Sequence, residues 1–277
     1  MQCKWLPPFS FKVCRLQSYS ITYAIITGAS KGIGKAIAYE LAKRKINLLL
    51  IARTEDLLID LAHDLGNNYS IDVDYFLADL ADPSSAQQIA DWCIINQYEI
   101  QYLVNNAGYG LSGSFDRYRL KDYLENMQVN MNMVVQLTYL FLPDLKKQKK
   151  GYILNIASSA AYQAIPYLSV YAATKSFVLQ FSRALHHELK KTNVSVTCIS
   201  PGATDTGFAD RAQVGEKGLK LANKVNMKPG DVAKIAVDAM FKGKMEVVTG
   251  FINKLGVFMA WLLPKRTVEK ASSRIYQ

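Results

Sequence analysis

The sequence of 277 residues predicts an α/β fold, in which one doubly wound parallel sheet of about seven strands carries helices on both faces. Two observations support this prediction. Short apolar runs alternate along the chain with longer stretches of helical spacing, the order typical of parallel strands joined by helices. Several of these runs are apolar at nearly every residue, as expected for strands that are covered on both faces.

The expected elements follow one another as strand and helix along the whole chain. The strands are the short apolar runs at 23–27, 47–52, 73–78, 102–105, 152–157, 194–199 and 246–249. The helices are the stretches of helical spacing and helix-forming composition at 33–45, 55–65, 84–96, about 120–147, 170–191 and 231–242. Asp82-Pro83 and Pro229-Gly230-Asp231 are start signals for the third and sixth helices. With no repeat and no low-complexity linker, we expect one domain at 21–250, a leader at 1–20 and an extension at 251–277.

The chain is strongly basic, with 33 Lys and Arg residues against 23 Asp and Glu and a net charge of +10. Such an excess suits nucleic acid, an anionic membrane surface or a phosphate-bearing ligand. No helix-turn-helix, zinc or RNP-type signature accompanies it, so we expect no nucleic-acid partner. Residues 217–277 carry most of the excess, with 12 Lys and Arg against 4 Asp and Glu.

Cysteine and histidine are too scattered to predict a metal centre or a disulfide framework. The cysteines form no C-x-x-C pair, which favours a reducing compartment; they are Cys3, Cys14, Cys93 and Cys198. His186 and His187 lack metal-ligand spacing and are interpreted as surface residues of a helix. Pro7, Pro8 and Lys12 interrupt the apolar part of the leader, so we expect no secretory signal and a cytoplasmic location.

The extension at 251–277 combines apolar residues with a basic edge at Lys265 and Arg266. Its apolar stretch, 251–263, contains Asn253 and Lys254 and falls short of the about 20 residues that span a bilayer. We expect a homo-oligomer, a dimer or a tetramer. Three interpretations of the extension stay open: a helix that covers a substrate cleft, a contact within that oligomer, and an anchor on an anionic membrane surface.

A glycine-rich turn follows the first expected strand and opens the first expected helix. It reads TGASKGIG over residues 27–34, with the spacing G-x-x-x-G-x-G. Glycines at such a turn let the backbone approach a pyrophosphate, which is then held at the positive end of the helix. The turn therefore predicts a Rossmann-type sheet that binds a dinucleotide.

The end of the second expected strand indicates which dinucleotide binds. An acidic residue about 20 positions after the glycines would bind the ribose 2′-hydroxyl of NAD. Arg53 stands there instead, and a guanidinium can pair with a 2′-phosphate. Lys31, inside the glycine turn, adds a second positive charge. We therefore expect NADP(H).

Tyr171 and Lys175 stand four residues apart on an expected helix, so they share one face. A phenol has an ordinary pKa near 10, and a neighbouring ammonium favours the phenolate that acid–base chemistry requires. Ser158 ends the fifth expected strand, at the sheet edge where ligands bind in open α/β folds. Its hydroxyl can bond a carbonyl oxygen while Tyr171 supplies a proton, and Ser159 is an adjacent rival for that role.

These features resemble the short-chain dehydrogenases/reductases over about residues 23–249, most of the chain. Four motifs match in order: the turn at 27–34, the NNAG segment at 105–108, the Ser158…Tyr171-x-x-x-Lys175 set and the SPGATDT segment at 200–206. The resemblance implies that Ser158, 13 residues before Tyr171, is preferred over Ser159.

The same resemblance implies further roles. Asn130 would hold a proton-relay water near Lys175, which would also bind the nicotinamide ribose. Asp79 would contact the adenine amino group, Asn105 would line the cofactor beside the central strand, and the segment at 200–206 would flank the nicotinamide amide. The implied cofactor residues are Gly28, Ser30, Lys31, Gly32, Ile33, Gly34, Arg53, Asp79, Leu80, Asn106, Ala107, Gly108, Tyr171, Lys175, Pro201, Gly202 and Thr206.

The implied reaction is NADPH-dependent reduction of a ketone or aldehyde to an alcohol, with Tyr171 as the acid. The substrate is expected to be a small molecule, hydrophobic like a 3-oxoacyl chain or a steroid-like ketone, under a lid at about 207–227. Candidate apolar lining residues are Tyr109, Tyr162, Ile165, Tyr167 and Leu168. The alternative is a dinucleotide-binding regulator or an inactive relative without turnover, against which the intact Ser158, Tyr171, Lys175 and Asn130 argue.

Overall fold

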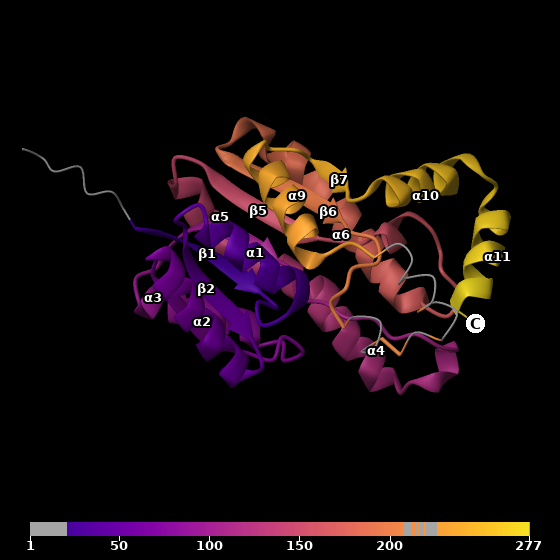
Figure 1. Cartoon of the computed structure of the whole chain (residues 1–277), viewed down its shortest axis with the longest axis horizontal. Coiled ribbons are helices and arrows are strands. Elements are labelled where there is room, and N and C mark those ends of the chain that lie inside the picture. The colour runs from indigo at the N-terminus through magenta and orange to yellow at the C-terminus, as the bar shows by residue number, and fades with distance from the viewer. Residues whose placement is uncertain (1–20, 208–211, 214, 216–218, 220–225, 277) are drawn as a thin grey trace, which may run out of the picture.

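A parallel sheet of seven strands runs through the molecule in the order β3-β2-β1-β4-β5-β6-β7 (Figure 1). The computed structural model describes residues 21–207, 212–213, 215, 219 and 226–276, so the leader and most of the predicted lid lie outside it. The strands are β1 (Thr22–Thr27), β2 (Asn47–Ala52), β3 (Val73–Leu77), β4 (Glu99–Asn105), β5 (Gly151–Ile156), β6 (Val194–Ser200) and β7 (Glu246–Val248). The predicted fold class, a doubly wound parallel α/β sheet, is confirmed.

The helices cover both faces of this sheet. They are α1 (Gly32–Ala42), α2 (Glu55–Tyr69), α3 (Ser85–Ile95), α4 (Leu120–Met127), α5 (Met133–Lys147), α6 (Ser169–Glu188), α9 (Pro229–Phe241), α10 (Phe251–Leu262) and α11 (Lys265–Tyr276). A short 3₁₀ turn, η3 (Ser159–Tyr162), follows β5. Strand order reverses between β1 and β4, and such a switch point opens a crevice at the carboxyl ends of the strands.

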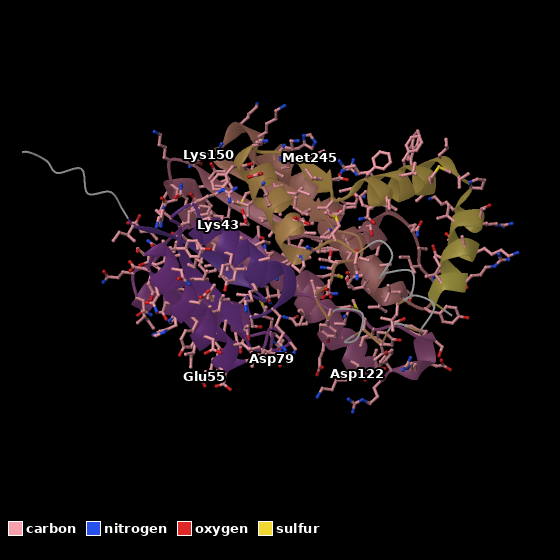
Figure 2. All side chains as sticks on the ribbon, viewed as in Figure 1. Lys43, Glu55, Asp79, Asp122, Lys150 and Met245 are labelled. Carbon is pink, nitrogen blue, oxygen red and sulfur yellow. The ribbon has the colours of Figure 1, made fainter. Side chains whose placement is uncertain are left out.

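Alternate residues of the central strands enter two separate cores. Ile26 and Leu50 are fully buried on the face that α1, α2 and α9 cover. Ile25 and Leu49, one residue earlier in the same strands, are fully buried on the face that α3 and α5 cover. Each strand therefore needs apolar residues at successive positions, which explains the continuous apolar runs in the sequence. Charged residues such as Glu55 and Lys150 extend outward into solvent (Figure 2).

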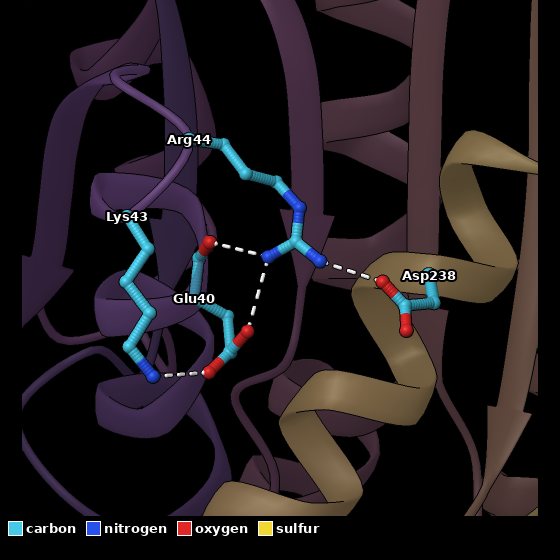
Figure 3. A network of polar contacts seen from close by, with 4 residues as sticks. All are labelled: Glu40, Lys43, Arg44 and Asp238. Carbon is cyan, nitrogen blue, oxygen red and sulfur yellow. Dashed lines mark hydrogen bonds and ion pairs between the residues drawn. The ribbon is translucent and has the colours of Figure 1, made fainter.

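An ion-pair network joins the end of α1 to α9 (Figure 3). Glu40 accepts from Lys43 Nζ at 2.6 Å and from Arg44 Nη1 at 3.0 Å. The other end of the Arg44 guanidinium donates to Asp238 Oδ1 at 2.6 Å. Because α1 starts at the glycine turn, this clamp holds the helix whose N-terminus faces the crevice.

The stretch predicted as one helix at 120–147 is divided in the structure. A π-helical turn at Gln128–Asn132 separates α4 from α5 and contains Asn130. Such turns take an extra residue and are frequent at functional sites.

The C-terminal extension also differs from the single element that the sequence predicted. It forms two helices, α10 and α11, which are joined at Leu263-Pro264. Within the described part of the chain, none of the helices is both long and apolar enough to cross a membrane.

Candidate active site

A cleft of about 1090 Å³ opens at the carboxyl ends of the strands, where the switch point lies. The glycine turn, the ends of β2 to β6, helix α6 and helix α11 all contribute to its wall. Most of the predicted site residues line it: Gly28, Ser30, Lys31, Gly32, Ile33, Arg53, Asp79, Leu80, Asn106, Ala107, Gly108, Ser158, Tyr171, Lys175, Pro201, Gly202 and Thr206. Gly34, Asn105 and Asn130 do not line it.

The glycine turn has a shape that only glycine provides. Gly28 and Gly32 have φ values of +65° and +58°, in the left-handed region that side chains disfavour. A Cβ on Gly34 would lie 2.3 Å from the Gly28 carbonyl oxygen, so this residue permits the close contact between turn and helix. The turn therefore leaves bare backbone at the N-terminus of α1.

A hydrogen-bonded latch fixes this turn to the end of β4. The buried Thr27 Oγ1 accepts from the backbone N–H groups of Asn106 at 3.0 Å and Ala107 at 3.1 Å. The Asn106 side-chain amide donates back to the carbonyl oxygens of Thr27 at 2.9 Å and Gly28 at 3.2 Å. The motif was recognised in the sequence, but this role of Thr27 was missed.

One end of the cleft is positively charged. Arg53 follows β2, is 55% exposed, and has its Nη1 3.9 Å from Asp79 Oδ1. Lys31 is exposed at the N-cap of α1, whose first turn contains no acidic residue. The bare turn, the helix N-terminus and these two cations fit a dinucleotide that carries phosphates.

The opposite part of the cleft contains the residues predicted to do the chemistry. Lys175 is buried, its Nζ donates to the Ile156 carbonyl oxygen at 2.8 Å, and it lies 5.9 Å from the Tyr171 ring centroid. Burial lowers the pKa of Lys175 to about 8, so the ammonium is retained at neutral pH. Ser158 caps the N-terminus of η3, and its Oγ accepts from the Ala160 N–H at 3.1 Å.

Asn130 lies behind this group rather than in the cleft. Its side chain is fully buried and brackets Tyr109, accepting from the Tyr109 N–H at 3.1 Å and donating to the Tyr109 carbonyl at 3.0 Å. It is also 3.0 Å from Thr174 Oγ1 on α6. A Cβ on Gly108 would lie 3.1 Å from both Asn130 Oδ1 and Lys175 Nζ. Asn130 thus packs against the loop that touches Lys175.

Asn105 is also placed away from the cleft. It is buried in the sheet, where its side-chain amide donates to Asn155 Oδ1 of β5 at 2.8 Å. Its expected place beside a cofactor is therefore not what the structure shows, because its side chain ties β4 to β5.

The apolar lining was predicted only in part. Tyr109, Ile165 and Leu168 line the cleft, whereas Tyr162 and Tyr167 do not. The Tyr162 hydroxyl instead bonds Glu246 and Ser200.

Helix α11 lines the cleft, as one of the three interpretations of the extension expected, but the individual contacts of α10 and α11 were not predicted. A Cβ on Gly202 would lie 2.1 Å from Asn253 Oδ1 of α10, so α10 can approach this closely only because residue 202 is a glycine. Ser272 and Ile275 of α11 line the cleft, and Gln163 Nε2 donates to Ser272 Oγ at 2.9 Å. The apolar and basic composition of the extension was the available signal, but it did not specify these partners.

The described residues contain no cluster of His, Cys, Asp and Glu that could hold a metal ion. His186 Nδ1 lies 2.8 Å from the Val196 carbonyl oxygen, so this ring contacts backbone. Cys93 and Cys198 are buried and free, while Cys3 and Cys14 fall in the leader, outside the described residues.

Comparison with known proteins gives the family. The short chain dehydrogenase model matches residues 22–217. An uncharacterized oxidoreductase of Staphylococcus epidermidis is 32% identical over 70% of this chain and 83% of its own length. The very-long-chain 3-oxoacyl-CoA reductase of Mus musculus is 34% identical over 68% of this chain, but the match spans only 61% of that protein.

Solved structures agree with this match. A short-chain dehydrogenase from Sphingobium yanoikuyae in complex with NADPH has a TM-score of 0.75 at 27% identity, covering 82% of this chain and 87% of the other. One from Burkholderia phymatum in complex with NAD has a TM-score of 0.77 at 23% identity, covering 87% and 94%, and shows the shared fold. The protein described here therefore belongs to the short-chain dehydrogenase family and is an oxidoreductase of that family.

Proposed function

We propose that the protein reduces a ketone or aldehyde carbonyl to an alcohol with NADPH. The observation that carries this proposal is that one cleft joins the glycine turn and Arg53 at one end to Ser158, Tyr171 and Lys175 at the other. A dinucleotide held by its phosphates at the first end would extend toward the second.

The residues at the phosphate end support NADPH over NADH. A nicotinamide cofactor supplies the hydride when it is bound. The turn offers backbone N–H groups for the pyrophosphate, and the exposed Arg53 guanidinium is free to turn from Asp79 toward a 2′-phosphate. Lys31 adds to the positive potential, whereas no carboxylate replaces Arg53 after β2.

Three side chains perform the proton chemistry in this proposal. Tyr171 gives its hydroxyl proton to the carbonyl oxygen as that oxygen gains charge. Ser158 donates a hydrogen bond to the same oxygen, as a preorganised dipole. The buried Lys175 ammonium, near the Tyr171 ring, favours the phenolate that remains, and its position is fixed by the Ile156 carbonyl.

Asn130 has a positioning role in this scheme. Its side chain is fully buried and bonded to Tyr109 and Thr174, so in this proposal it acts on Lys175 through Gly108 and α6. If Asn130 holds the proton-relay water that we predicted, its backbone would bind that water, not its side-chain amide.

The part of the cleft near Tyr171 favours an apolar substrate. Ile165, Leu168 and Ile275 line the cleft beside Tyr171. Apolar walls with a few convergent polar groups are typical of sites for hydrophobic small molecules. We propose a hydrophobic ketone, such as a 3-oxoacyl chain or a steroid-like molecule.

The test is NADPH oxidation with a panel of ketones of increasing apolar size, on the wild type and the Tyr171→Phe variant. Loss of the general acid is expected to lower kcat at least about 100-fold and leave the Kd for NADPH within about twofold. Tyr139→Phe, at an exposed tyrosine of α5 outside the cleft, is the matched control and should retain full activity. NADPH binding without turnover of any ketone would favour the alternative, a regulator that binds dinucleotides.

A further inference from the structure

Helix α10 turns its large apolar side chains to solvent. Phe251 and Trp261 are 80% and 78% exposed, and no residue of the helix is buried. Figure 1 places α10 and α11 at the end of the molecule opposite α2 and α3, and Figure 2 shows side chains along α10 extending away from the body. We call these outward residues the α10 apolar face: Phe251, Ile252, Leu255, Phe258, Met259, Trp261, Leu262 and Leu263.

The inward side of α10 carries smaller residues. Asn253, Val257 and Ala260 recur at helical spacing, and each is half-buried. The Asn253 amide donates to the Thr249 carbonyl at 2.8 Å and packs against Gly202. The helix is thus fixed by the side that carries Asn253, so its apolar face is not used for packing against the part of the chain that the structure describes.

Exposed basic side chains occur on α10 itself and on α11, the helix that follows it. Lys254 of α10 and Lys265, Arg266, Lys270 and Arg274 of α11 are all exposed. Residues 251–277 contain no other charged residue except Glu269. Apolar and aromatic side chains beside a basic edge match the acyl chains and the headgroups of an anionic lipid surface.

We propose that the α10 apolar face docks in the plane of a membrane that contains anionic lipids, with the exposed cations of α10 and α11 on the headgroups. The 12 residues of α10 extend about 18 Å, well short of the about 30 Å of a hydrocarbon core, so the helix lies on the surface. A second copy of the chain fits less well, because a two-fold contact through this face would bring two basic edges together.

Docking in this way also orients the cleft. Ser272 and Ile275 line it from α11, and Gln163 ties Ser272 to η3. The α11 end of the cleft would therefore open beside the bilayer, where apolar molecules are concentrated.

The experiment is flotation of the full-length protein with phosphatidylcholine vesicles, with and without phosphatidylglycerol. We expect binding to the anionic vesicles that weakens in high salt. Phe258→Glu/Trp261→Glu should bind at least about tenfold more weakly. Ile94→Glu/Ile95→Glu is the matched control on α3, where both side chains are more than 70% exposed, and it should bind like the wild type.

A second variant tests the contribution of the basic side chains to vesicle binding. Lys265→Gln/Arg266→Gln is expected to bind roughly 30-fold more weakly, since each basic side chain near an anionic surface contributes about fivefold. Lys146→Gln/Lys149→Gln, at exposed lysines near the end of α5, should have no such effect. Brominated lipid should quench Trp261 fluorescence, and the quenching should be lost in Trp261→Phe.

Two outcomes would overturn the proposal. One is no flotation of the wild type, or equal flotation of the wild type and the Phe258→Glu/Trp261→Glu variant. The other is a wild-type dimer that binds no vesicle and that this variant converts to a monomer in sedimentation experiments, which would assign the face to a second copy of the chain.

Discussion

Replacing Arg53 by Asp is expected to weaken NADPH binding much more than NADH binding. The guanidinium stands at the phosphate end of the cleft, and its ion pair with Asp79 spans 3.9 Å between side chains that are both 55% exposed. Exposed pairs of this kind contribute about 0–1 kcal/mol. Arg53 can therefore leave Asp79 for a 2′-phosphate at little cost.

The size of the effect follows from this exposure. A hydrogen bond to a charged group contributes about 1.5–3 kcal/mol, and the lower value suits a guanidinium that is more than half exposed. The new carboxylate would add a repulsion of about 1 kcal/mol toward the phosphate through solvent. Together these weaken NADPH binding about 70-fold. NADH has a hydroxyl at that position, so its Kd should stay the same or fall.

The assay is titration of the protein with each cofactor, followed by nicotinamide fluorescence. Lys35→Asp makes the same charge change on α1, outside the cleft. This variant measures how far a change in the net charge of the protein alone alters cofactor binding. The ratio of the NADPH Kd of Arg53→Asp to that of the wild type should become smaller in high salt, because the contact is exposed. Equal weakening of NADPH and NADH by Arg53→Asp, or an equal effect of Lys35→Asp, would refute the reasoning.

Two other substitutions probe the end of the cleft for which we propose the proton chemistry. Gly108→Ala places a Cβ 3.1 Å from both Asn130 Oδ1 and Lys175 Nζ. This crowding should lower kcat at least about tenfold and lower the free energy of unfolding by about 1–3 kcal/mol, measured by enzyme assay and urea unfolding. Gly230→Ala is the control, because its Cβ would meet no atom within 4 Å. For Lys175, burial lowers the pKa from 10.5 to about 8, so the folded protein disfavours the charged amine. The free energy of unfolding of the wild type, relative to Lys175→Met, should rise by about 3 kcal/mol between pH 8 and pH 10.5 and be flat below pH 7; a constant difference across this range would contradict the assigned pKa.

The sequence predicted the elements of the sheet well because their signal is local. Each strand carries its own short apolar run, so all seven were found, although β4 begins at Glu99 rather than at 102. The helix expected at 120–147 contains a π-helical turn, and Asn126 and Asn130 tie this stretch to the Tyr109 carbonyl, to which they donate at 2.8 and 3.0 Å. That constraint comes from a loop at a distance in the sequence, which helical spacing does not reveal.

The same distinction applies to the site. The glycine turn and the Tyr171–Lys175 pair are contiguous patterns, and the structure places them in one cleft. The contact of Gly202 with Asn253 joins residues that are far apart in the chain, so no local pattern predicts it. Tyr162 was misplaced for a related reason, since η3 directs it toward Glu246 on the last strand. Side-chain direction in such irregular segments depends on tertiary contacts.

The four residues at 105–108 connect the two ends of the cleft. Asn105 ties β4 to β5. The backbone N–H groups of Asn106 and Ala107 donate to Thr27 Oγ1 and so hold the glycine turn. Gly108, the next residue, lies against Lys175 and Asn130. A displacement of this segment therefore moves the glycine turn and the surroundings of Lys175 together. Changes here should impair cofactor binding and turnover jointly, whereas Arg53→Asp acts on binding and Tyr171→Phe acts on turnover.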